Sequence, residues 1–106
     1  MSVTDMRRSS RHPVDHQVIG EHRAKGDVQL HICNISPHGF MVDNAPDVAR
    51  GDRLVIRLPN LGRIEAYCIW LTGERAGFQF ERIIRLDDYL GLIEQMQPNP
   101  RLRNTR

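Results

Sequence analysis

The chain has 106 residues, of which 40% are hydrophobic and 26% are charged, and its net charge is +2. This composition is ordinary for a globular protein, and the length allows one compact domain but not two. No apolar run approaches the ~20 residues of a membrane span, and the polar N-terminus lacks the apolar core of a secretory signal. We therefore expect a cytoplasmic protein without membrane insertion.

The small net charge and the low aromatic content of 6% are unfavourable for binding a nucleic-acid polymer. Surfaces of that kind usually combine a basic groove with several aromatic residues that stack on bases. The positive charge is nonetheless unusual in kind, because Lys25 is the only lysine among the 15 basic residues. Arginine presents a planar fork of donors that matches phosphate and the acceptor edge of guanine. A general preference for Arg codons would give the same total, so the positions of the arginines matter more than their number.

The predicted elements begin with a flexible basic arm, residues 1–12, because this segment is polar and Pro13 disfavours a helix before it. Beyond the arm, apolar and polar residues alternate in short runs, which is the period-2 pattern of half-buried strands. Six strands are predicted in this way, at residues 14–21, 28–33, 40–42, 54–58, 64–71 and 78–83. Their spacing of about 8–15 residues is typical of an all-β sandwich or barrel. A barrel would also leave no exposed strand edge.

The hydrophobic period changes after the sixth predicted strand. Leu86, Tyr89, Leu90 and Ile93 follow the i, i+3, i+4, i+7 spacing of an amphipathic helix that begins near Leu86. Two aspartates fall in its first turn, where the helix dipole favours negative charge, and two prolines follow its end. We therefore expect three parts in the chain: a flexible arm at 1–12, a β-domain with a C-terminal helix at 13–97, and a disordered tail at 98–106.

The first polar motif is Arg7-x-x-x-Arg11, in the arm ahead of the first strand. Two guanidinium groups on a flexible segment can close over an anion, and each charge-assisted hydrogen bond contributes roughly 1.5–3 kcal/mol. Alone, the motif is better explained as a solvated basic N-terminus.

The second polar motif is Asn34-x-Ser36-x-x-Gly39, at the junction of two predicted strands. The short Asn and Ser side chains can hydrogen-bond to nearby backbone or to a ligand. Gly39 can adopt a positive φ or let a ligand approach the backbone. Alone, this motif is better explained as a tight turn between strands.

An aromatic motif follows near the end of the fifth predicted strand. Trp70 precedes Gly77-Phe78-Gln79-Phe80 by seven residues. We expect both phenylalanines to pack in the core. Trp70 is open to two interpretations, because an indole beside arginines can also stack on a base or a guanidinium.

In this order the three motifs resemble the PilZ domain family over residues 6–97, nearly the whole folded part. The resemblance implies a bacterial protein with a six-stranded antiparallel β-barrel, a C-terminal α-helix and a site for cyclic di-GMP on the outer surface of the barrel. It also implies signalling to an unidentified partner protein, with the arm becoming ordered when the ligand binds. The residues that the resemblance assigns to the ligand are Arg7, Arg11, Asn34, Ser36 and Gly39, with Arg8, His38 and Trp70 as secondary contacts.

The chain departs from the family pattern at one position of the second motif. Asn34 stands where Asp is commoner, and its neutral amide offers one acceptor oxygen in place of two. Recognition of guanine N–H groups is therefore expected to be weaker. Pro37 should stiffen the turn, and His38 could lie near a phosphate.

The remaining chemistry-bearing residues indicate no catalytic or metal centre. Cys33 and Cys68 lie in apolar strand-like runs, where we expect two buried free thiols. The five histidines show no close Cys/His spacing for a metal, and no nucleophile–base pair or phosphate-binding glycine loop is recognisable. We expect neither an enzyme nor a cofactor. A PilZ-like adaptor that does not bind nucleotide remains the alternative, although both intact polar motifs favour a receptor.

Overall fold

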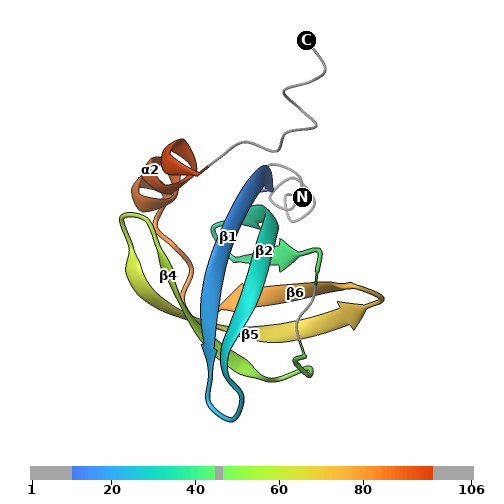
Figure 1. Cartoon of the computed structure of the whole chain (residues 1–106). Coiled ribbons are helices and arrows are strands. Elements are labelled where there is room, and N and C mark those ends of the chain that lie inside the picture. Colours follow the sequence, from blue (N-terminus) through green and yellow to red (C-terminus); the bar gives the residue numbers. More distant parts are fainter. Residues whose placement is uncertain (1–10, 45–46, 97–106) are drawn as a thin grey trace.

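The computed structural model describes residues 11–44 and 47–96 (Figure 1). This part of the chain forms six strands followed by one helix. The elements are β1 (His12–His22), β2 (Gly26–Ser36), β3 (Gly39–Val42), β4 (Arg53–Leu58), β5 (Gly62–Thr72), β6 (Arg75–Phe80) and α2 (Leu86–Gln95). Arg7, Arg8 and the predicted tail lie outside the described residues.

The six strands close into a barrel in the order β1-β2-β3-β6-β5-β4, and every neighbouring pair is antiparallel. Pairing of Glu21 with Val55 joins β1 to β4 and completes the ring. The predicted six-stranded antiparallel barrel with a C-terminal helix is therefore confirmed. Closure satisfies the backbone groups that an open sheet would leave at its edges.

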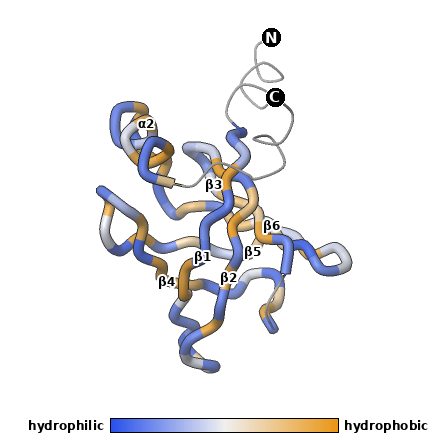
Figure 2. The backbone as a smooth tube through the Cα atoms, turned by 45° about the horizontal axis from the view of Figure 1, so that its top comes forward, coloured by the Kyte–Doolittle hydropathy of each residue, from blue (hydrophilic) through white to orange (hydrophobic). Residues whose placement is uncertain are grey.

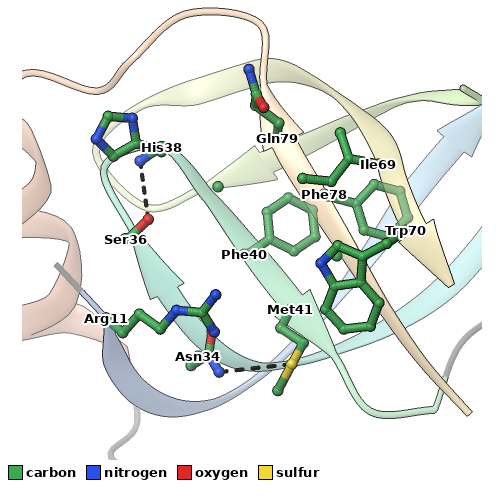
Figure 3. Close-up of a pocket in the computed structure, with 12 residues that line it drawn as sticks. Arg11, Asn34, Ser36, His38, Phe40, Met41, Ile69, Trp70, Phe78 and Gln79 are labelled. Atoms are coloured by element: carbon green, nitrogen blue, oxygen red, sulfur yellow. Dashed lines mark hydrogen bonds between the residues drawn. The ribbon is translucent and has the colours of Figure 1, made fainter. Parts of the chain in front are cut away.

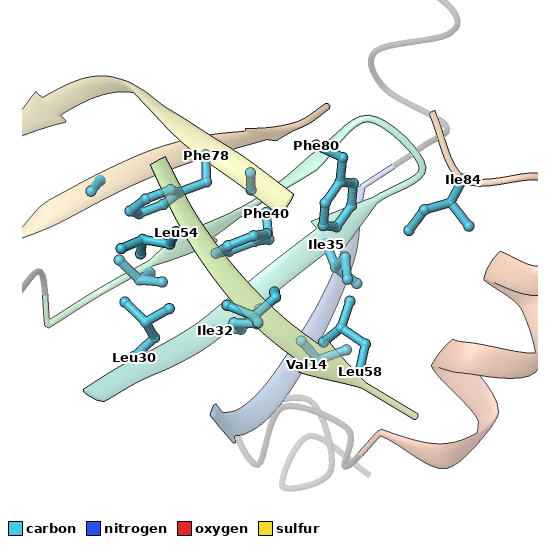
Figure 4. Packing of buried hydrophobic residues seen from close by; sticks show 14 of the residues in the cluster. Val14, Leu30, Ile32, Ile35, Phe40, Leu54, Leu58, Phe78, Phe80 and Ile84 are labelled. Carbon is cyan, nitrogen blue, oxygen red and sulfur yellow. The ribbon is translucent and has the colours of Figure 1, made fainter. Parts of the chain in front are cut away.

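Alternate residues of the strands fill the barrel interior (Figure 4). The rings of Phe40 and Phe78 are stacked with centroids 5.1 Å apart, and Phe80 lies against Phe40 at 5.5 Å. Core packing is thereby confirmed for both phenylalanines of the aromatic motif. Figure 2 shows hydrophobic stretches along the strands and mostly hydrophilic turns between them, as expected for strands with one buried face.

Three strands each contain one extra residue relative to their partners. The register shifts lie between Pro13 and His16 in β1, Ile32 and Asn34 in β2, and Cys68 and Trp70 in β5. Such bulges change which face a side chain points to. The bulge in β2 explains why Cys33 is only half-buried, so the prediction of two buried thiols is wrong for Cys33 and confirmed for Cys68.

The last strand differs from its prediction at both ends. It was expected at 78–83, but β6 runs from Arg75 to Phe80. After Phe80 the chain leaves the barrel wall. The backbone N–H of Ile84 donates at 2.9 Å to the carbonyl of Pro37 in the β2–β3 turn, and this bond holds the segment after β6 beside that turn. Ile83 consequently faces solvent and is 65% exposed.

The helix α2 begins at Leu86, as predicted, and packs on the barrel through Tyr89, Leu92 and the following Met96. The Tyr89 hydroxyl donates to the carbonyl of Ile35 at 3.0 Å, which ties the helix to the end of β2. No helix in the described residues is long and apolar enough to cross a membrane.

Candidate functional site

Strand pairing brings Arg11, the described residue of the first polar motif, to the second polar motif at one place on the barrel. His12 at the start of β1 pairs with Ile35 near the end of β2, and Pro13 pairs with Asn34. Arg11 directly precedes His12, so it lies beside the end of β2 where Ser36 stands. Antiparallel pairing thus joins residues that are more than twenty positions apart in the sequence.

A pocket of about 130 Å³ opens at this point on the outer surface of the barrel (Figure 3). It is bordered by Arg11 and by residues of β2, β3, β5, β6 and the β2–β3 turn. The lining residues are Arg11, Asn34, Ser36, His38, Gly39, Phe40, Met41, Ile69, Trp70, Gly77, Phe78 and Gln79. None of these twelve is acidic, so the pocket offers the Arg11 guanidinium to an anion without a competing carboxylate.

Six of the eight predicted site residues are brought together in this lining: Arg11, Asn34, Ser36, Gly39, His38 and Trp70. The other two, Arg7 and Arg8, lie outside the described residues.

Asn34 reaches the outer face because of the bulge in β2. It pairs with Met41 of β3, and paired residues on antiparallel strands share a face. The Asn34 amide nitrogen, Nδ2, donates to the Met41 sulfur, Sδ, at 3.9 Å. Both side chains are half-buried, and Figure 3 shows Arg11 next to them at the same side of the pocket.

Ser36 ends β2 and begins a two-residue turn formed by Pro37 and His38. Its hydroxyl oxygen accepts a hydrogen bond from the His38 backbone N–H at 3.1 Å. Because the oxygen is the acceptor there, the hydroxyl can still donate its proton to a ligand. The turn is also bonded to the end of β6, because the backbone N–H of Phe80 donates to the His38 carbonyl at 2.8 Å.

Gly39 is a glycine for a packing reason. Its φ is not positive, and it lies in β3 opposite Gln79 of β6. A Cβ atom at this position would be 2.0 Å from the carbonyl oxygen of Phe78, which is backbone and cannot move aside. The close approach of β3 to β6 therefore requires glycine.

Trp70 forms one wall of the pocket. The bulge in β5 pairs it with Gly77 of β6 on the outer face, next to Ile69, which is 41% exposed. The half-buried indole lies over Gly77, where a Cβ would be 2.1 Å from Nε1. An aromatic surface is thus held in one place at the pocket edge, where it can stack on a planar ligand group.

Six further lining residues were not expected at a ligand site: Phe40, Met41, Ile69, Gly77, Phe78 and Gln79. Gln79 lies beside the β2–β3 turn and donates through Nε2 to the Tyr67 hydroxyl at 3.3 Å. The period-2 pattern assigns Gln79 and Met41 to the outer face. Met41 lies in no motif, and Gln79 stands in the aromatic motif only as the residue between two core phenylalanines. The bulge that turns Ile69 and Trp70 outward has no marker in the sequence.

A charged cluster joins β1, β2 and the residue that follows β3. Both ring nitrogens of His31 in β2 are bonded to carboxylates, Nε2 to Asp15 of β1 and Nδ1 to Asp43 after β3, the latter at 2.8 Å. The hydrogen bond to Asp15 and then that to Asp43 raise the pKa of His31 above its ordinary value, while burial opposes them. Because both ring nitrogens of His31 are occupied by these hydrogen bonds, the side chain connects β2 to β1 and to Asp43 and has no nitrogen left for a metal ion. Within the described ranges no cluster of His, Cys, Asp and Glu is arranged to hold a metal ion.

The described residues therefore form a small closed β-barrel with a C-terminal helix and a polar pocket beside the β2–β3 turn. The family model of the PilZ domain matches residues 5–95, which is most of the chain. The chain therefore belongs to the PilZ domain family, a family of cyclic di-GMP receptors that are generally not enzymes. No curated protein shows a significant match to it.

Proposed function

We propose that this protein is a cytoplasmic receptor for cyclic di-GMP and that it binds the ligand at the pocket beside the β2–β3 turn. The observation that carries the proposal is the convergence of Arg11, Asn34, Ser36 and Trp70 from three separate segments on one pocket free of acidic lining residues. A receptor needs no reacting group, and the proposal assigns none.

The pocket chemistry is complementary to a cyclic dinucleotide. The Arg11 fork suits a phosphate or the O6/N7 edge of guanine. The Ser36 hydroxyl can donate to a phosphate oxygen, and the carbonyl oxygen of Asn34 can accept from guanine N–H groups. Trp70 supplies a planar surface on which a base can stack. Under this proposal Gly39 lets the chain turn past the ligand while keeping β3 against β6.

The size of the pocket supports a role for the segment before Arg11. A volume of about 130 Å³ is small, since pockets for small molecules usually enclose about 300–1,000 Å³. A cyclic dinucleotide would protrude from it. We propose that ligand binding fixes residues 1–10 over the exposed side of the ligand, with Arg7 and Arg8 contacting phosphates or guanines.

Signalling would follow from this rearrangement. Covering the ligand creates a surface that is absent from the ligand-free protein, and a partner protein can bind that surface selectively. The free energy of this switch can be no larger than the difference in ligand-binding free energy between the two states of the arm. Unchanged ¹⁵N relaxation of residues 1–10 at saturating ligand would refute the ordering step.

The test of binding is isothermal titration calorimetry with cyclic di-GMP, with GTP as the ligand control. Arg11→Ala should weaken binding about ten- to hundred-fold, since one charge-assisted hydrogen bond contributes roughly 1.5–3 kcal/mol. Arg57→Ala is the matched control, because Arg57 is an exposed arginine of β4 that does not line the pocket. It should leave the affinity unchanged.

Two results would contradict the proposal. Saturable binding that is equally strong in Arg11→Ala would move the site elsewhere. No heat with the wild-type protein, together with an unshifted melting temperature, would remove the receptor function. The non-binding adaptor would then be the better description, and a partner pull-down the next experiment.

A further inference from the structure

We propose that Met41 is a specificity-determining residue that orients the Asn34 amide so that the pocket prefers guanine to adenine. This inference rests on the proposed function, binding of a cyclic dinucleotide at this pocket. It assigns a role to a residue outside the three sequence motifs.

The two side chains meet because of the strand geometry. One extra residue in β2 puts Asn34 directly opposite Met41 of β3 on the outer face of the barrel. The Asn34 Nδ2 lies 3.9 Å from the Met41 Sδ, in hydrogen-bond contact (Figure 3). Both residues line the pocket, and both are half-buried.

The contact distinguishes the two ends of the amide. An Asn side chain has an NH₂ group that only donates and an oxygen that only accepts. A thioether sulfur carries no proton and is a weak acceptor, so it can bond only to the NH₂ end. Rotating the amide by half a turn would place the Asn34 oxygen against the sulfur, with no proton between them. Met41 therefore favours the orientation in which Oδ1 points away from the sulfur.

This orientation matters for the base that is bound. Guanine presents N–H donors on its Watson–Crick edge at N1 and N2, whereas adenine presents an acceptor at N1 beside its amino group. An Asn that rotates freely can match either base, because it can offer its oxygen or its NH₂ group. An Asn whose oxygen is fixed toward the ligand matches guanine better.

The role of Met41 depends on Asn34 standing where the family pattern commonly has Asp. A carboxylate accepts through both oxygens and needs no partner to choose its orientation. It also cannot donate to a thioether. The effect of Met41 should therefore be present with Asn34 and absent after Asn34→Asp.

The experiment is a double-mutant cycle that measures affinities for cyclic di-GMP and cyclic di-AMP by calorimetry. The affinity for the weaker ligand is measured through its competition with the stronger one. The proteins are the wild type, Met41→Leu, Asn34→Asp and the double variant. Met96→Leu is the matched control, because Met96 is a buried methionine after α2 that does not line the pocket. Melting temperatures verify that each variant is folded.

Met41→Leu should lower the preference for cyclic di-GMP over cyclic di-AMP by about two- to five-fold, the lower part of the range for one net hydrogen bond, because the sulfur is a weak acceptor. The same substitution in the Asn34→Asp protein should change the preference by less than about two-fold, within the additivity of independent sites. Met96→Leu should change neither affinity. In the ligand-free wild type, an NOE is expected between the Asn34 side-chain amide protons and the Met41 methyl group.

The following results would overturn the inference. An equal loss of affinity for both dinucleotides would mean that Met41 only shapes the pocket. An unchanged preference in Met41→Leu, or the absence of the NOE, would remove the orienting role while leaving cyclic di-GMP binding intact. No binding of cyclic di-GMP by the wild type would overturn the proposed function itself and this inference with it.

Discussion

The indole of Trp70 occupies the space that a side chain at Gly77 would need. The two residues are paired across β5 and β6, and a Cβ at Gly77 would lie 2.1 Å from Nε1 and 2.4 Å from Cε2 of the indole. Trp70 and the glycine of the aromatic motif therefore form one structural unit. This unit fixes the aromatic wall of the pocket.

Gly77→Ala should displace the Trp70 indole, because the new methyl group and the ring cannot share the same space. We expect a loss of about 1–3 kcal/mol in unfolding free energy from overpacking. Trp70 is the only tryptophan in the chain, so its fluorescence emission should report the displacement directly as a red shift. Gly91→Ala is the control, because a Cβ there meets only the end of the Asn60 side chain at 2.9 Å. An identical emission spectrum in Gly77→Ala would refute the contact.

Gly39→Ala should disrupt the pairing of β3 with β6. The added Cβ would lie 2.0 Å from the Phe78 carbonyl oxygen, so the backbone must separate. We expect a loss of about 3 kcal/mol or more, or a failure to fold. Gly20→Ala is the matched buried control, because its nearest contacts are the Leu30 and Leu54 side chains at 3.2 Å, which can adjust. Equal losses in the two variants, measured by urea unfolding, would contradict this explanation.

Tyr89→Phe should loosen the attachment of α2 to the barrel. The Tyr89 hydroxyl donates to the Ile35 carbonyl at 3.0 Å, and burial raises the pKa of Tyr89, which keeps the donor protonated. Because the substitution leaves a buried carbonyl without this donor, it should lower the unfolding free energy, measured with urea, by about 1–3 kcal/mol. Tyr67→Phe removes a hydroxyl that only accepts from the exposed Gln79, and its effect should stay within about 0.5 kcal/mol. The prediction fails if the two variants are equally stable.

The His31 cluster should make stability depend on pH. The carboxylates of Asp15 and Asp43 raise the pKa of His31 above 6.5, so the protonated ring stabilises the folded state. That contribution is fully present below the unfolded value and is lost as the pH rises through the raised folded value. The unfolding free energy of the wild type should therefore exceed that of His31→Gln by the largest amount at about pH 6. This difference should shrink as the pH rises toward about 9. A difference that is constant over this range would show that the charge of His31 is irrelevant.

Much of the architecture could be predicted from local patterns. Period-2 alternation located the six strands, and the change to helical spacing located the start of α2 at Leu86. Alternation could not predict the three bulges, because an extra residue in a strand is set by its partners across the barrel. The end of β6 at Phe80 was missed for a related reason, since the bond from Ile84 to the Pro37 carbonyl is a long-range contact.

The site residues were expected from the resemblance to the PilZ family and not from the spacing alone, which is equally satisfied by a plain turn. Strand pairing places Arg11 beside Asn34 and Ser36 around one pocket, and their binding of a ligand stays a prediction. The orientation of Asn34 toward Met41 and the packing reason for Gly39 depend on which residue lies opposite in the neighbouring strand. A sequence without its register does not contain that information.

The most direct test of the account is a titration of ¹⁵N-labelled protein with cyclic di-GMP, followed by two-dimensional NMR. We expect the largest shifts at the Trp70 indole N–H, the Asn34 side-chain amide and the backbone amides of Ser36 and Gly39. The amides of Arg57 and Ile64, outside the pocket lining, should not move. Shifts concentrated away from the pocket, or no shifts at millimolar ligand, would contradict the claim that this pocket binds cyclic di-GMP.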